Sequence, residues 1–247
     1  MQVSWKKIVW VGFLLAAPLF LGGANGEGCG TSSVLENLSD DSSKEAKVEK
    51  ARIEVDEKKY DEAIKTLADL CGTVLTAPTC DPDIVSLYAS AHAGRADLDL
   101  FALIKEGNLQ ATSGTGSFTL FSKYFSSPTA ADVSDMGGAV ALLASIANRT
   151  PDRGLQLATV ATSDLVIFLG SLTGGYSPTT GKPMTPPLIS DITPDAVSRV
   201  SADLTLMTQG LSEAGLGSQN ISGHIQQIIG PFSGGDPLAI VTFLNNL

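Results

Sequence analysis

Histidine is scarce in this chain, and no motif for catalysis or cofactor binding is complete. The two histidines, His92 and His224, have no cysteine, histidine or carboxylate at the three- or four-residue spacing of metal ligands. A phosphate-binding loop fails at Gly181, because Tyr176 stands where the first glycine is required. The patterns C-x-x-C-H and G-x-S-x-G, typical of c-type haem attachment and of a nucleophile elbow, are missing. We therefore expect no enzymatic activity, no cofactor and no metal site.

Positive charge is also in short supply. Sixteen Lys and Arg residues face 26 Asp and Glu residues, which gives a formal net charge of −10. Such a surface repels phosphate backbones and anionic lipid headgroups, so we expect neither nucleic-acid binding nor membrane binding through a basic patch. Charged residues make up only 17% of the chain and hydrophobic residues 43%. This composition predicts a folded protein with a large core rather than a disordered acidic tail.

The N-terminus carries the pattern of an export signal. Lys6 and Lys7 precede an uncharged apolar run at residues 8–21, and small residues follow up to Ala24. The run contains a proline and is shorter than the roughly 20 residues that a membrane-spanning helix needs. We interpret residues 1–28 as a cleaved export signal, which predicts a periplasmic location in a bacterium. The alternative is an uncleaved N-terminal anchor.

The three cysteines are Cys29, Cys71 and Cys80. Thiols of exported proteins tend to pair, and the short segment between Cys71 and Cys80 contains glycine and proline, which favour a turn. We therefore predict a disulfide between these two residues. The alternative is a pair of reduced thiols that lie in the core as small hydrophobic side chains.

Cys29 follows the export signal and precedes a polar segment at residues 29–43 that suits a flexible tether. This arrangement resembles the N-terminus of bacterial lipoproteins, which implies a lipid on Cys29 and anchoring to the outer membrane. The sequence departs from the lipobox of that family at Gly26 and Glu27. The alternative is cleavage near Ala24, which would leave a soluble periplasmic or secreted protein.

Apolar residues at helical spacing begin at Lys44. Within this region, KKYDEAIKTL (residues 58–67) resembles the turn and second helix of a tetratricopeptide repeat, although Lys47 stands where the first helix of that repeat has an aromatic residue. The next helix would carry Ile84, Leu87, Tyr88 and Ala91 on one stripe. The resemblance implies stacked helical hairpins over residues 44–107, as in exported bacterial lipoproteins with helical-repeat domains.

Residues 108–247 continue the helical pattern as an irregular bundle. Four helix starts share one pattern, a capping residue followed by proline at the first helical position; the capping residues are Asp81, Thr150, Thr193 and Asp236. The segment around residues 155–172 is apolar nearly all round, which predicts a helix through the centre. Residues 173–193 are rich in glycine and proline and cannot form a regular helix, so they are either a functional insertion or a solvated connection. The fold class expected is all-α.

Stacked hairpins present a groove, and such folds generally act by binding other proteins. We expect a protein partner in the cell envelope and a groove between the hairpin at residues 46–71 and the helices at residues 83–106. The lining residues that we predict are Tyr60, Tyr88, His92 and Arg95.

The alternative function is that of a carrier for a small apolar ligand or lipid. Four aromatic residues together with the central apolar helix could line a cavity; they are Phe118, Phe121, Tyr124 and Phe125. The simpler interpretation is that these rings fill the core.

Overall fold

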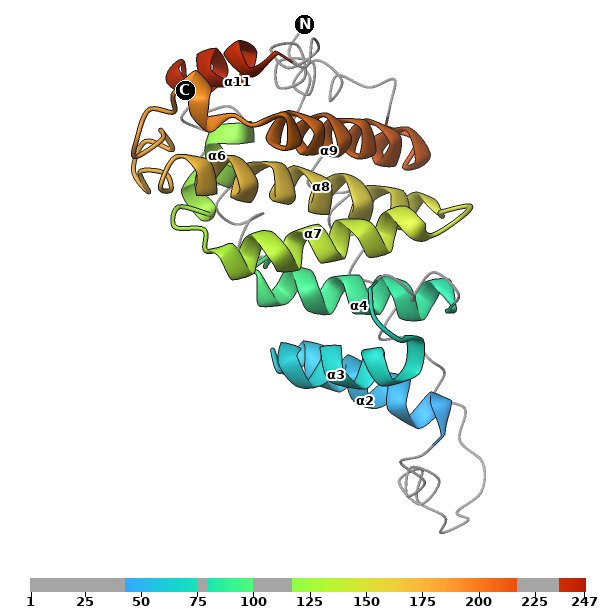
Figure 1. Cartoon of the computed structure of the whole chain (residues 1–247). Helices are drawn as coiled ribbons and strands as arrows, with labels where there is room; N and C mark the ends of the chain where they lie inside the picture. The colour runs from blue at the N-terminus through green and yellow to red at the C-terminus, as the bar shows by residue number, and fades with distance from the viewer. Residues whose placement is uncertain (1–42, 75–79, 100–116, 217–235) are drawn as a thin grey trace, which may run out of the picture. The chain divides into compact units, whose positions relative to one another are not determined.

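The computed structural model describes residues 43–74, 80–99, 117–216 and 236–247, and most of these residues lie in α-helices (Figure 1). These ranges contain eight α-helices and no strand, which confirms the all-α prediction. The helices are α2 (Lys44–Asp56), α3 (Tyr60–Cys71), α4 (Pro82–Arg95), α6 (Ser117–Tyr124), α7 (Ala130–Ser145), α8 (Pro151–Leu172), α9 (Pro194–Glu213) and α11 (Pro237–Asn245). A short 3₁₀ helix, η3 (Ile189–Asp191), precedes α9.

The chain divides into two compact units, Met1–Asp41 and Ser42–Leu247. The export signal, Cys29 and most of the predicted tether belong to the first unit and lie outside the described residues. The boundary that we predicted after residue 107, and His224, also fall outside them.

Most of the described helices of the second unit pack in one series that follows their order in the chain. The packing runs from α2 to α3, then to α4, α7, α8 and α9 (Figure 1). Helix α6 packs against α8, and α11 contacts η3. Two glycines allow α8 and α9 to approach closely, because a Cβ on Gly154 of α8 would lie 2.8 Å from the Gly210 carbonyl oxygen of α9.

The four predicted helix starts are confirmed. Asp81, Thr150, Thr193 and Asp236 each accept a hydrogen bond from a backbone N–H in the first turn of α4, α8, α9 and α11, and proline occupies the first turn of each helix. A fifth cap has no proline. Thr129 and Asp132 form a capping box at the start of α7.

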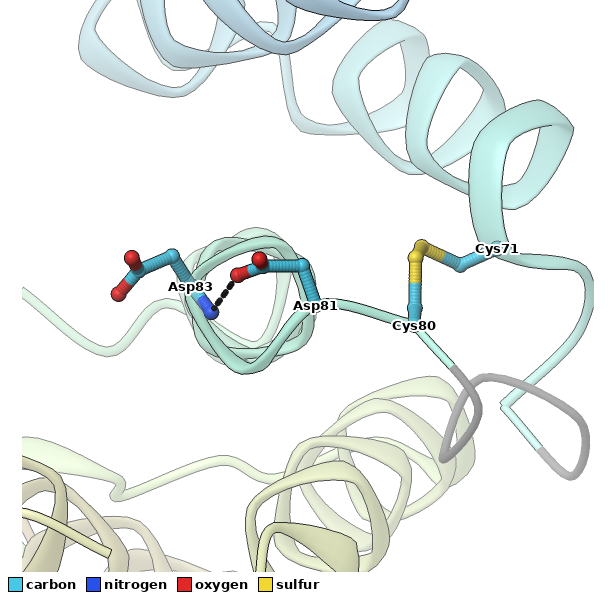
Figure 2. Close-up of a disulfide and its surroundings, with 4 residues drawn as sticks. All are labelled: Cys71, Cys80, Asp81 and Asp83. Carbon is cyan, nitrogen blue, oxygen red and sulfur yellow. Dashed lines mark hydrogen bonds between the residues drawn. A yellow bond between two sulfur atoms is a disulfide. The ribbon is translucent and has the colours of Figure 1, made fainter.

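The predicted disulfide is confirmed as well. The sulfur atoms of Cys71 and Cys80 are within bonding distance, and their Cα atoms are 5.5 Å apart. Figure 2 shows that the bridge joins the end of α3 to the residue before the Asp81 cap of α4. The bridge therefore fixes the exit of one helix to the entry of the next.

Helix α8 is the central element that the sequence predicts. Its buried residues include Leu157, Leu165, Val166, Ile167 and Leu169, and it packs against α6, α7 and α9. Among the described helices it alone has the length and hydropathy of a membrane-spanning segment, but 61% of that stretch is buried within the fold. Burial of this kind is what the core helix of a helical domain requires.

Candidate functional site

Two of the four side chains predicted to line a partner groove lie in the core. Tyr88 is 3% exposed and His92 is 8% exposed, so neither offers a surface to a partner. The physical reason is that α4 packs between α3 and α7, which buries both of its sides. Tyr60 is partly exposed, with its ring against Gly94 of α4, and the Arg95 side chain is about one-third exposed. The burial of Tyr88 and His92 corrects the predicted lining.

His92 and Arg95 belong to a polar cluster between α3, α4 and α7. Arg95 donates to Asp135 of α7 from Nε at 2.8 Å and to Asp61 of α3 from Nη1 at 2.7 Å. The His92 Nδ1 atom lies 3.1 Å from Asp135 Oδ1. Burial acts to raise the pKa of Asp135, but the hydrogen bonds from Arg95 and His92 outweigh it and hold the pKa below its usual range.

Because Asp135 is ionised, His92 must donate to it from Nδ1, which leaves Nε2 as the acceptor nitrogen. That Nε2 atom is buried and has no hydrogen-bond partner among the described residues. Burial lowers the pKa of His92, against the opposing effect of Asp135, so the imidazole is neutral at neutral pH. The cluster is therefore a structural tie between three helices with one unsatisfied ring nitrogen.

A second polar cluster lies between α7, α8 and α9. Arg199 of α9 donates to both carboxylate oxygens of Asp164 in α8, at 2.7 Å from Nη2 and 3.2 Å from Nε. The same Nη2 donates to the Val133 carbonyl of α7 at 2.9 Å, and the guanidinium lies 4.6 Å from the centre of the Phe168 ring. Asp203 of α9 is buried beside this pair. The sequence pattern marks Asp164 as unusual within an apolar helix but does not identify its partners.

The connecting loop, residues 173–193 between α8 and α9, is firmly anchored. Tyr176 is buried, its N–H donates to the Ser126 carbonyl at 2.7 Å, and its hydroxyl donates to the Val166 carbonyl at 2.9 Å. The Ser122 hydroxyl of α6 donates to the Gly181 carbonyl at 2.9 Å. The sequence predicted either a functional insertion or a solvated connection and did not indicate whether the loop is ordered. In the structure, hydrogen bonds hold the loop against α6 and α8.

Glycine is required at two points of the connecting loop. Gly175 has φ of 100°, and a Cβ there would lie 2.5 Å from the Ser126 carbonyl oxygen. Gly181 has φ of 72°, and a Cβ would lie 2.6 Å from the Ser122 hydroxyl oxygen. These close approaches allow the loop backbone to dock on α6 and the residues that follow it.

Three large apolar side chains of this anchored loop point to solvent. Met184, Leu188 and Ile189 are 63%, 65% and 53% exposed, and we call them the apolar tip. Leu238 of α11, the helix that contacts η3, is also exposed. The only other large hydrophobic side chain exposed among the described residues is Ile53 of α2. Grouped exposure on an ordered loop is typical of an interaction surface.

The charges near the apolar tip differ from those of the chain as a whole. Residues 165–190 contain no Asp or Glu, and Lys182 is exposed two residues before Met184. The exposed carboxylate that follows, Asp191, accepts a hydrogen bond from the Leu188 N–H at 2.8 Å. The apolar tip therefore has one exposed basic residue, Lys182, before it in the chain and one exposed acidic residue, Asp191, after it.

The described residues also bear on a metal site and on an aromatic cavity. No group of three or more His, Cys, Asp or Glu side chains that could hold a metal occurs within the described ranges. The aromatic rings near α6 pack edge-to-face on one another, with centroids 5.0 Å apart for Phe118 and Phe243 and 4.8 Å apart for Tyr124 and Phe125. This packing favours the core-filling interpretation of these rings, and the carrier function stays a prediction.

Comparison of the chain with protein-family models, with curated proteins and with solved structures finds no match. The candidate site is therefore defined by geometry alone: an ordered loop with an apolar tip, carried between two helices that a buried ionic cluster holds together.

Proposed function

We propose that the chain is a non-catalytic helical scaffold that binds another protein through the apolar tip of the connecting loop. The exposure of Met184, Leu188 and Ile189 on a loop held by backbone hydrogen bonds carries this proposal. A rigid loop loses little conformational entropy on binding, so its apolar side chains contribute more of their burial energy to affinity.

The partner that fits this surface has an apolar groove with an acidic rim. The tip consists of exposed apolar side chains, which fit into a groove of a partner, and Lys182 supplies a cation close to them in the chain. Four half-exposed side chains offer much less than the roughly 800 Å² per partner of a standard-size interface. This small area favours docking into a groove of another protein over stable pairing of two copies of this chain.

The wider context of this proposal comes from the sequence. The N-terminal pattern supports export, and a lipid on Cys29 would tether the protein to the outer membrane within reach of partners in the cell envelope. The consecutive packing of α2 on α3 and of α3 on α4 supports an arrangement like that of tetratricopeptide repeats. In such a stack α2, α3 and α4 would separate the N-terminal tether from the helices α8 and α9, which hold the connecting loop.

The test is a crosslinking experiment in the native host. A photoreactive amino acid at Thr185, beside the tip, is expected to capture one partner, and the double substitution Leu188→Asp with Ile189→Asp is expected to abolish the capture. The matched control is Ile53→Asp, which places the same charge at an exposed apolar side chain of α2 and should leave capture unchanged.

Two outcomes would contradict the proposal. Equal capture by the tip variant and by the Ile53→Asp control would remove the tip as the contact surface. Binding of the purified chain to phosphatidylethanolamine vesicles that the tip variant abolishes would identify a lipid surface in place of a protein.

A further inference from the structure

The two helices that bracket the connecting loop meet at a pair of buried carboxyl groups. Asp164 of α8 is 2% exposed and Asp203 of α9 is 3% exposed. Two carboxyl groups at this depth cannot both ionise without a large desolvation and repulsion cost. Arg199 is the cation that acts on both of them.

The hydrogen bonds divide the charge unequally between the two carboxyl groups. Arg199 donates two hydrogen bonds to Asp164 and none to Asp203, so Asp164 is the ionised member. Asp203 lies one helical turn beyond Arg199 on α9 and close enough to Asp164 for each carboxyl group to affect the other, so their mutual repulsion is relieved only if one of them carries a proton. The Oδ2 atom of Asp203 is buried without a partner among the described residues. A neutral carbonyl oxygen tolerates that position far better than a charged one.

The groups that face Asp203 can be named element by element. Helix α8 contributes the Asp164 carboxylate, α9 contributes Arg199, and α7 contributes the Val133 carbonyl, which accepts from Arg199. Burial, together with the charge of Asp164, raises the pKa of Asp203 to about 9. Burial also raises the pKa of Asp164, against the lowering effect of Arg199.

We propose that Asp164 and Asp203 share one proton, that this proton latches α8 to α9, and that its loss loosens the connecting loop and weakens binding at the apolar tip. The last step rests on the proposed function, whereas the first two stand without it. The latch lies nine residues before the loop on one side, at Asp164, and six residues after it on the other, at Arg199. The contact therefore joins the two helices that lead into and out of the loop.

The direction of the pH effect follows from the raised pKa of Asp203. Above the ordinary pKa of an aspartate, about 4, the unfolded chain has lost this proton but the folded chain keeps it. The proton therefore stabilises the fold most in acid, and the stabilisation falls as the pH rises towards about 9, above which it is gone.

The first test is a carboxyl ¹³C NMR titration of the purified chain. The Asp203 side-chain carbon is expected to titrate on the alkaline side of neutral pH, well apart from the exposed carboxyl groups. Titration of Asp203 together with those exposed groups would overturn the proposal. This measurement uses the unmodified protein, so it decides the question even if a variant fails to fold.

The second test is the substitution Asp203→Asn. The amide has the shape of a protonated carboxyl group and donates to Asp164 at every pH. The melting temperature of the variant is expected to change little between about pH 5 and about pH 9, whereas that of the wild type falls. Asp69→Asn makes the same side-chain replacement at an exposed site of α3 and should show the same fall in melting temperature with pH as the wild type. An equal fall in all three proteins would overturn the latch.

The third test addresses the loop, using the partner captured at the tip. Raising the pH from about 7 to about 9 is expected to weaken binding at least tenfold for the wild type but not for Asp203→Asn. Equal weakening in both proteins would overturn the coupling to the loop. Failure to find any partner would count against the proposed function alone, because the titration and the melting curves report on the latch without it.

Discussion

Removal of the Cys71–Cys80 disulfide should destabilise the protein by an amount that the structure allows us to calculate. The bridge spans a sequence separation of 9 residues, and the chain-entropy relation gives about 2.6 kcal/mol for closing a loop of that length. In a folded unit of this size, about 1 kcal/mol corresponds to roughly 2–4 °C in melting temperature. The double substitution Cys71→Ala with Cys80→Ala should therefore lower the melting temperature by about 5–10 °C.

Far-UV circular dichroism measures this change, and reduction provides an independent route to it. Dithiothreitol should lower the melting temperature of the wild type to that of the double variant and should leave the double variant unchanged. Cys29→Ala serves as the control, because Cys29 is the cysteine outside the bridge and its replacement should not alter the transition. A double variant that melts within about 1 °C of the wild type would refute the loop-closure reasoning.

Three further substitutions test how the helices are joined, and thermal or urea unfolding measures each. Arg149→Met should cost about 3 kcal/mol or more, because this buried side chain satisfies three carbonyls at the end of α7 and pairs with Glu213; an equal cost for Glu213→Gln would contradict this account. Gly154→Ala should destabilise by about 1–3 kcal/mol, since its Cβ would meet α9, whereas Gly138→Ala has ordinary contact distances and should stabilise by about 0.5–1 kcal/mol. Thr129→Ala should cost about 1 kcal/mol through loss of the capping box, and no measurable loss would show that α7 does not depend on it.

Local signals in the sequence predicted the helix starts and the disulfide, because both depend on residues close together in the chain. A capping oxygen followed by proline acts within one helical turn, and Cys71 and Cys80 are separated by a short turn. The burial of Tyr88 and His92 depends instead on α7, which supplies Asp135 from 43 residues further along the chain than His92. Helical periodicity identifies one apolar face and does not indicate that a helix has neighbours on two sides.

The apolar tip illustrates the same limit. Glycine and proline correctly predicted an irregular segment at residues 173–193. Whether such a segment is ordered depends on partners elsewhere, and here Ser122 and Ser126 provide them. The sequence did not predict the Asp164–Asp203 pair for a related reason, because only the packing of α8 on α9 brings the two carboxyl groups together.

The packing of α2, α3, α4, α7, α8 and α9 in one series has a consequence for amide hydrogen exchange. In a series of this kind, a helix at the end has support on one side, and it can open without disturbing the rest. Among the described helices α2 is such an end, with only Ala51 and Glu54 buried, whereas α8 packs against three helices. Among these helices, the amides of α2 should exchange first and those of α8 last. Deuterium uptake by the native protein would therefore follow the order of the helices from the end of the series to its centre.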